Sequence, residues 1–167
     1  MTTSWTHFHT AQPGLAETVR NRFGGYKHHV LGTLRADGSP RLSGIEAEFR
    51  LGELWFGMMP GSRKALDLRR DPRFALHGNP VPDTSMDGGD VRISGRAVEV
   101  TDPAAVTRFT REVTVPEGPF HLFRADIAEV VRTYVEDEDL VLQVWRPGGP
   151  LRTIRRGSDE SPPRTEV

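Results

Sequence analysis

Three consecutive side chains that could bind a phosphate, Ser62, Arg63 and Lys64, follow an apolar stretch of this sequence. Residues 54–59 include Trp and Phe among apolar neighbours, a composition typical of a buried strand. Pro60–Gly61 would end that strand. Ser62 then stands where a helix would begin, so we predict that its side chain is the N-cap of that helix.

Basic side chains are unusual in the first turn of a helix, because the helix N-terminus already carries partial positive charge. Arg63 and Lys64 fall in that turn, so backbone N–H groups, a hydroxyl and two cations would face one anion. Lys64 stands out because only two of the 22 basic residues are lysines. The sequence therefore predicts a phosphate site at 62–64, although a solvated basic helix start would have the same pattern.

The helix that carries these side chains is predicted to end at Arg70, because Pro72 cannot continue a helix. Leu66 and Leu68 are expected to anchor it in the core. Arg69 and Arg70 are expected to lie on its solvated face. The predicted site would thus sit on a short helix between two strands.

Composition excludes several classes of function. With 167 residues, a single domain is expected. A net charge of −1 favours neither bulk nucleic-acid binding nor membrane adsorption. The absence of cysteine removes disulfides, thiolate metal sites and cysteine nucleophiles. No apolar run approaches the ~20 residues of a membrane span, and no signal-peptide pattern precedes the first strand, so a cytoplasmic location is expected.

The remaining elements are short and bounded by turns. A polar lead-in is expected over 1–10 and a helix over 11–23. Strands are expected over 28–35, 41–50 and 54–59, joined by tight turns into an antiparallel meander. Further strands are expected over 73–78, 90–101, 122–134, 140–145 and 151–155, with a loop over 79–89 and another helix over 102–113.

This succession of short strands and turn signals predicts a mainly β fold, a small antiparallel barrel with a few helices. Residues 1–156 would form its single domain. Residues 157–167 are low in apolar side chains and are expected to be a disordered tail.

The run over residues 31–76 resembles the pyridoxamine 5′-phosphate oxidase-like superfamily of flavin-binding split barrels. The shared pattern is a strand, a D-G-x-P turn, an alternating strand and an apolar strand. S-x-K and a helix ending in L-R-R-D-P-R follow. The likeness is strong over about residues 26–78 and looser over the later strands.

The resemblance implies a six-stranded antiparallel Greek-key split barrel that forms a homodimer with its cofactor at the interface. FMN is the implied cofactor, or the deazaflavin coenzyme F-420 in some branches, or haem in a few members. A flavin-dependent oxidoreductase acting on an unidentified small molecule is the implied function. Two alternatives stay open: a non-catalytic flavin- or haem-binding protein for storage or sensing, and a haem-degrading split barrel.

The resemblance also implies which residues touch the cofactor. Ser62, Arg63 and Lys64 match a phosphate-binding segment of the family. Further matches are Arg41 and Ser43 near the phosphate and ribityl chain, Met58 and Met59 beside the ring, and Trp145 near the partner's cofactor. No side chain is named as catalytic acid or base, because the flavin itself carries hydride transfer.

Two departures from the family pattern restrict these expectations. Gly44 stands where deazaflavin-binding members often carry Asn. The C-terminal segment lacks the R-L-x-P ending of the true pyridoxamine phosphate oxidases. Oxidation of pyridoxamine phosphate is therefore not the expected reaction.

The remaining histidines and tryptophans are expected to be structural. His28 and His29 would point to opposite faces of a strand, so they make a poor chelate and no metal site is predicted. His77 could ligate haem, but a hydrogen bond from this strand end to the backbone is the expected role. Trp5 and Trp55 are expected to pack in the core.

Overall fold

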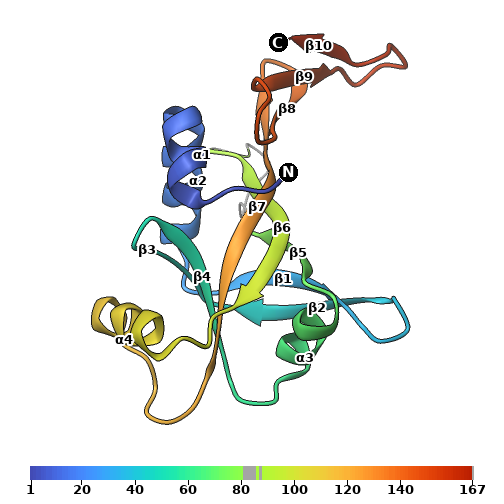
Figure 1. The fold of residues 1–167 in the computed structure, drawn as a ribbon. Helices are drawn as coiled ribbons and strands as arrows, with labels where there is room; N and C mark the ends of the chain where they lie inside the picture. The colour runs from blue at the N-terminus through green and yellow to red at the C-terminus, as the bar shows by residue number, and fades with distance from the viewer. Residues whose placement is uncertain (81–85, 87, 167) are drawn as a thin grey trace.

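The computed structural model describes residues 1–80, 86 and 88–166, and these residues form ten strands and four helices (Figure 1). In chain order the elements are α1 (Trp5–Ala11), α2 (Pro13–Gly24), β1 (His29–Leu34), β2 (Pro40–Ile45), β3 (Ala47–Arg50), β4 (Glu53–Met58), α3 (Arg63–Arg70), β5 (Arg73–His77), β6 (Asp90–Glu99), α4 (Pro103–Glu112), β7 (His121–Glu136), β8 (Asp139–Trp145), β9 (Arg152–Arg156) and β10 (Arg164–Glu166).

The strands form a series whose two ends, β2 and β3, are consecutive in the chain, so the sheet closes into a barrel. β1 pairs with β5, β5 with β6, β6 with β7, β7 with β4 and β4 with β3. The strand predicted over 41–50 is divided at Glu46 into β2 and β3, and β2 pairs with β1. The β2–β3 corner therefore joins the two ends of this series of strands.

All strand pairings of the described residues are antiparallel. This confirms the mainly β, antiparallel split-barrel class expected from the sequence. The Greek-key arrangement of six strands stays a prediction. Of the loop expected over 79–89, residues 81–85 and 87 lie outside the described part of the chain. No helix within the described residues is long and apolar enough to cross a membrane.

Two N-terminal helices cover part of the sheet. The expected polar lead-in is instead α1, with Ser4 as N-cap accepting a hydrogen bond from the His7 amide. Trp5 is 2% exposed and its ring centroid lies 4.4 Å from that of Phe49 on β3. The expected packing role of Trp5 is thus confirmed. The lead-in prediction was wrong because two buried aromatic side chains among polar neighbours are enough to anchor this short helix.

A second, smaller apolar cluster lies under α4. Phe109 of α4 packs on Trp55 of β4, with ring centroids 5.4 Å apart, and Leu122 of β7 completes the cluster. The Asp102 carboxylate caps the helix by accepting a hydrogen bond from the Ala105 amide. In Figure 1, α4 lies at the opposite end of the molecule from β8–β10.

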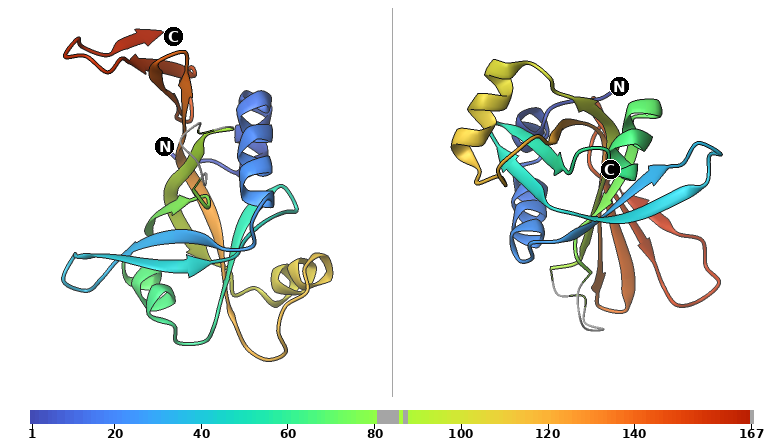
Figure 2. Two further views of the ribbon diagram at one scale, coloured as in Figure 1. Left: turned by 180° about the vertical axis from the view of Figure 1, so that it is seen from behind. Right: turned by 90° about the horizontal axis from the view of Figure 1, so that it is seen from below.

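Strands β8, β9 and β10 project from the barrel as an arm on the end of β7 (Figure 2). Part of the tail expected to be disordered is therefore a strand, because β10 pairs with β9 over Arg164–Glu166. Polar contacts hold it: the Arg164 guanidinium forms an ion pair with Asp139. These contacts replace the apolar side chains that the tail lacks.

The longest pairing in the barrel contains an irregularity that requires glycine. The register of β6 against β7 shifts between Ser94 and Gly95. A Cβ added to Gly95 would lie 2.0 Å from the carbonyl oxygen of Asp126. The two backbones therefore approach too closely for any side chain at this position.

Replacing Gly95 with alanine is expected to lower the free energy of unfolding by about 3 kcal/mol, because the methyl group forces the two strands apart. Urea denaturation measures the change. Gly14→Ala in α2 is the control, since an added Cβ there meets nothing within 4 Å. A Gly95→Ala variant as stable as the Gly14→Ala variant would contradict this account of the β6–β7 pairing.

Candidate functional site

An open pocket of about 510 Å³ lies beside the β2–β3 corner. Its walls come from the ends of β2 and β4, the first turn of α3, α4 and the loop that follows α4. Met58, Met59 and Lys64, which the sequence analysis assigned to a cofactor site, all line it. We take this pocket as the candidate functional site.

Lys64 is the cation of the pocket. Its Nζ donates a hydrogen bond of 2.6 Å to the carbonyl oxygen of Gly44 on β2. The side chain is half-buried, and this burial lowers the pKa of Lys64, because it disfavours the charged form. An anion entering the pocket would find a cation that is already held in place and partly stripped of water.

Two glycines leave bare backbone at the pocket wall. Gly44 on β2 and Gly57 on β4 both line the pocket, and a Cβ added to either would meet nothing within 4 Å. Any side chain at these positions would occupy space that is now open. A flat ligand could therefore lie close to both strands.

The opposite wall is apolar. Phe109 from α4 and Val113 at its C-cap, with Val115 and Phe120 from the loop, line this side of the pocket. Met58 is 3% exposed and belongs to the core, whereas Met59 is 76% exposed. The pocket thus offers Lys64 and an apolar wall, which suit a ligand with both a phosphate and a ring system, and three carboxylates, Glu46, Glu48 and Glu117, line it as well.

A buried carboxylate on α3 fixes the helix against the barrel. Asp67 accepts hydrogen bonds from the Thr33 hydroxyl (2.9 Å), the Arg41 Nε (2.7 Å) and the Arg70 guanidinium (3.1 Å). Burial alone would raise the pKa of Asp67, but the hydrogen bonds from Arg41, Thr33 and Arg70 outweigh it and hold this pKa below its usual value. The helix is therefore tied to β1 and β2 by a charge.

The start of α3 is correctly placed by the sequence, but its cap differs. Ser62 occupies the N-cap position with extended backbone, yet its hydroxyl makes no capping hydrogen bond. The Ser62 Oγ is buried and has no hydrogen-bond partner among the described residues. Arg63 is exposed. Neither Ser62 nor Arg63 lines the pocket, so Lys64 is the residue of the predicted 62–64 segment that the structure places at the pocket wall.

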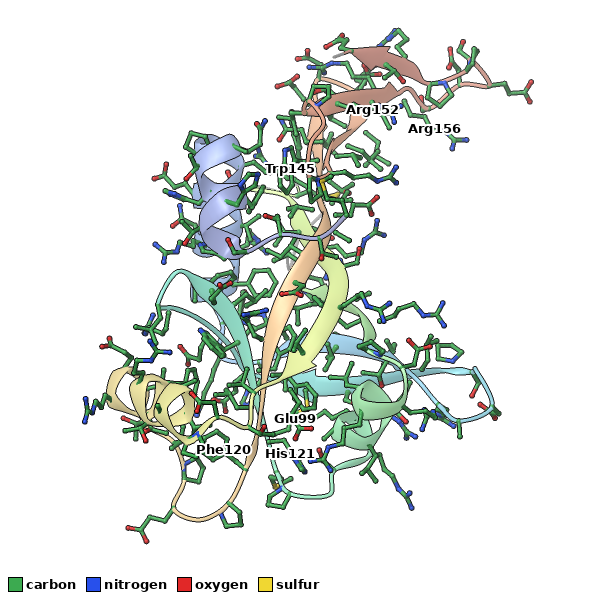
Figure 3. All side chains as sticks on the ribbon, in the orientation of Figure 1. Glu99, Phe120, His121, Trp145, Arg152 and Arg156 are labelled. Atoms are coloured by element: carbon green, nitrogen blue, oxygen red, sulfur yellow. The ribbon has the colours of Figure 1, made fainter. Side chains whose placement is uncertain are left out.

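A polar cluster supports the turn that leads into α3. The Gly61 amide donates to His121 Nε2 at 3.0 Å, and His121 Nδ1 lies 2.9 Å from Glu99 Oε1. Arg69 donates to both oxygens of Glu99 at 2.7 Å. These bonds from Arg69, together with the contact from His121, hold the pKa of Glu99 below its usual value. Figure 3 shows Glu99 and His121 side by side, with Phe120 next to them.

The other residues predicted to contact the cofactor, Arg41, Ser43 and Trp145, do not line the pocket. Arg41 and Ser43 lie on the same face of β2, half-buried, and Arg41 is engaged by Asp67. Trp145 is 1% exposed and packs on Phe8, with ring centroids 4.9 Å apart. The predicted contact of Trp145 with a partner's cofactor was therefore wrong, because this side chain is enclosed by its own core, far from α3 and α4 (Figure 3).

Several predictions for α3 are corrected as well. Leu66 is 39% exposed, and the buried positions are Ala65, Asp67 and Leu68. Arg69 is not simply solvated, since it pairs with Glu99 of β6. Sequence reasoning missed the contacts of Asp67 and Arg69 because their partners, Arg41 and Glu99, lie in other elements. The one local signal was the spacing of Asp67 and Arg70, which form an i,i+3 ion pair.

His28 and His29 are oriented as expected, and His77 makes its expected backbone contact, but His28 also lines the pocket. His29 is buried beside Phe23, whereas His28 lines the pocket and pairs with Glu46, so the two point to opposite faces. His77 Nδ1 bonds the carbonyl of Gly78, which confirms the expected backbone contact. No group of metal-ligating side chains large enough to hold an ion occurs in the described ranges.

The sequence matches the family described as pyridoxamine 5′-phosphate oxidase over residues 15–134, which is well over half of the chain. None of the curated proteins matches it.

Three solved structures share the fold. A pyridoxamine 5′-phosphate oxidase-related, FMN-binding protein from Nostoc punctiforme superposes with a TM-score of 0.63 at 15% identity, covering 93% of this chain and 95% of that one. A haem-binding protein from Mycobacterium smegmatis gives 0.58 at 16% identity, covering 80% and 58%. A haem storage protein from Vibrio cholerae gives 0.51 at 14% identity, covering 68% and 89%. At such identities the likeness concerns the fold alone.

Replacing Asp67 with asparagine is expected to destabilise the protein at neutral pH by about 3 kcal/mol, because it leaves Arg41 without its partner. The folded pKa of Asp67 lies below the ordinary value of 3.8. Its contribution is therefore complete above that pH and is lost as the pH falls through the folded pKa. The stability difference between wild type and Asp67→Asn should accordingly narrow in acid.

Urea denaturation at neutral pH and at about pH 3 measures that difference. Asp137→Asn is the matched control, because Asp137 lies exposed in the β7–β8 turn and makes no hydrogen bond or ion pair with another described residue. A stability difference for Asp67→Asn that is absent at neutral pH, or that does not change with pH, would show that the carboxylate does not hold α3.

Proposed function

The chain belongs to the pyridoxamine 5′-phosphate oxidase-like superfamily, and on that premise we propose that it binds a flavin in the pocket beside α3 and acts as an oxidoreductase on a small molecule. FMN is the proposed cofactor, with the deazaflavin coenzyme as the alternative. The observation that carries this proposal is the position of Lys64 at one end of a pocket whose walls are bare glycine backbone and apolar side chains.

The residues present fit a flavin. Lys64, held at the pocket wall by Gly44, would bind the phosphate, and Ser62 and the exposed Arg63, which precede it at the start of α3, would add to this binding. Gly44 and Gly57 leave room for the ring, with Phe120 on the apolar wall. When bound, the flavin would supply hydride transfer, and the chain would supply binding and orientation.

A homodimer is part of the proposal. Leu42 is 75% exposed and shares the outward face of β2 with Gly44, which lines the pocket. Met59 is exposed on another wall of the pocket. Apolar side chains exposed beside an open pocket are suited to burial by a second copy that would close it. The cytoplasmic location stays a prediction.

Haem binding without turnover is the second candidate. His28 lines the pocket and could supply an axial ligand, and two structures with this fold are described as haem proteins. A haem-degrading activity would need the same ligand. The absorption spectrum of the purified protein separates the two: flavin and deazaflavin absorb differently from haem, and loss of a haem spectrum in His28→Ala would favour the second candidate.

Lys64→Ala is expected to weaken FMN binding about ten- to a hundredfold, or on the order of 1.5–3 kcal/mol, because one charge-assisted hydrogen bond to the phosphate is lost while Ser62 and the helix start remain. Isothermal titration measures the dissociation constant, and thermal melting checks that the fold is kept. Riboflavin, which has no phosphate, should lose much less affinity.

Arg108→Ala is the matched control for Lys64→Ala. Arg108 is an exposed cation on α4 that makes no hydrogen bond or ion pair with another described residue. Its loss changes the net charge equally without touching the pocket wall. Equal FMN affinities for wild type, Lys64→Ala and Arg108→Ala would overturn the assignment of the phosphate to α3.

Sedimentation is expected to show a dimer. Its interface would bury roughly 2,000 Å² or more. Leu42→Glu should shift the dimer to monomer, because a charge would be buried in the contact. Leu51→Glu is the control, since Leu51 is 52% exposed in the β3–β4 turn, away from the pocket lining. A wild-type monomer at micromolar concentration, or a dimer that Leu42→Glu leaves intact, would contradict the proposed interface.

A further inference from the structure

The turn between β4 and α3 is held by a histidine from a distant part of the chain. His121 begins β7 and lies opposite Met58, the last residue of β4. From there its Nε2 accepts the hydrogen bond of the Gly61 amide at 3.0 Å. Gly61 has a φ of +65°, and the next residue, Ser62, opens the proposed phosphate site. The imidazole thus fixes the turn immediately before the groups that would bind phosphate.

The protonation state of His121 follows from its partners. A backbone N–H can only donate, so the Nε2 that faces Gly61 must carry a lone pair. The proton of the neutral ring is then on Nδ1, which donates to Glu99 Oε1 at 2.9 Å. The opposite tautomer would place two N–H groups against each other at the Gly61 contact. The structure therefore assigns one neutral tautomer.

The groups around the imidazole of His121 do not require Nδ1 to accept a hydrogen bond. Glu99 from β6 and Arg69 from α3 are the charged groups that contact it among the described residues, and Phe123 lies beside it on β7. The Arg69 guanidinium also lies 3.2 Å from His121 Nδ1, but it donates to both oxygens of Glu99 at 2.7 Å, so it does not need Nδ1 as an acceptor. The His121 side chain is 15% exposed, so bulk water has little access to replace the Gly61 contact.

We infer that His121 is a positioning residue that holds the β4–α3 turn in its phosphate-binding conformation only while its imidazole is neutral, so that acidification loosens the flavin. This inference rests on the proposed function. A doubly protonated ring has no lone pair at Nε2, and its N–H would face the Gly61 N–H. The two donors must separate, which moves the turn and the start of α3. Histidine is the side chain that changes protonation in the mildly acidic range.

Two substitutions separate the contacts of the ring. His121→Gln places an amide oxygen where Nε2 lies, so it keeps an acceptor for Gly61 but does not titrate. His121→Asn reaches only to the Nδ1 position, so it keeps the contact with Glu99 and leaves Gly61 without an acceptor. His9→Gln on α1 is the matched control, because His9 is exposed there.

The experiment measures the dissociation constant for FMN between about pH 8 and pH 5.5. Titration of the FMN phosphate affects every variant equally, so variants are compared at each pH. We expect wild type and His9→Gln to lose about tenfold more affinity on acidification than His121→Gln, the loss that one hydrogen bond accounts for. His121→Asn should bind weakly at both ends of the range. A His121→Gln variant with the wild-type pH profile would overturn the inference.

The amide of Gly61 gives a readout that does not depend on flavin. In the protein without cofactor, the Gly61 amide should lose protection in wild type as the pH falls. The ratio of its exchange rate in wild type to that in His121→Gln should therefore rise on acidification. Equal relative rates would overturn the positioning role. A wild type that binds no FMN at any pH would instead overturn the proposed function and the link to flavin release, while the Gly61 amide would still decide whether His121 holds the turn.

Discussion

One buried carboxylate determines where the helix of the candidate site can lie. The Asp67 side chain is 5% exposed, and a charge so buried is costly unless donors surround it. Its donors come from β1, β2 and α3 itself, through Thr33, Arg41 and Arg70. Only one placement of α3 brings all three together. Lys64 lies almost one turn earlier on the same helix, so the same placement delivers its ammonium group to Gly44.

The helix is short of apolar contacts, which gives these polar ones more weight. In α3 the buried apolar side chains are Ala65 and Leu68. Polar contacts act at both ends: Arg70 reaches the carbonyl of Leu34, and the turn before the helix is held by His121. Hydrogen bonds are directional, so they define the orientation of the helix more narrowly than a small apolar contact would. A phosphate site needs that definition, because its donors must converge on one anion.

The pocket itself is a consequence of the way the sheet closes. Its glycines come from β2 and β4, which meet through β3 at the corner, and its apolar wall comes from α4 and the loop that leads into β7. The same fold is found in structures described as FMN-binding and as haem-binding. The fold therefore does not select the ligand, and the side chains at the pocket do. In this chain the pocket presents Lys64 at the start of α3 and bare backbone at Gly44 and Gly57.

Local signals in the sequence determined most of the elements. Ser62, Pro72 and the intervening pattern correctly placed the start and end of α3, because N-caps and prolines act within one turn of the chain. Strand positions followed from alternation and turn residues for the same reason. The segment 62–64 was predicted to bind phosphate from its residue types and its position at a helix start, and the structure places Lys64 in the pocket.

Only the tertiary structure decided how those elements are joined and what their charges do. Asp67 meets Arg41 across 26 positions, and Gly61 meets His121 across 60. Neither pair has a sequence signature, since the partners are brought together by strand register and barrel closure. Trp145 shows the reverse case: a local resemblance assigned it to a cofactor, but packing on Phe8 from the first helix enclosed it in the core. Local propensity depends on neighbours in the chain, whereas burial and pairing depend on neighbours in space.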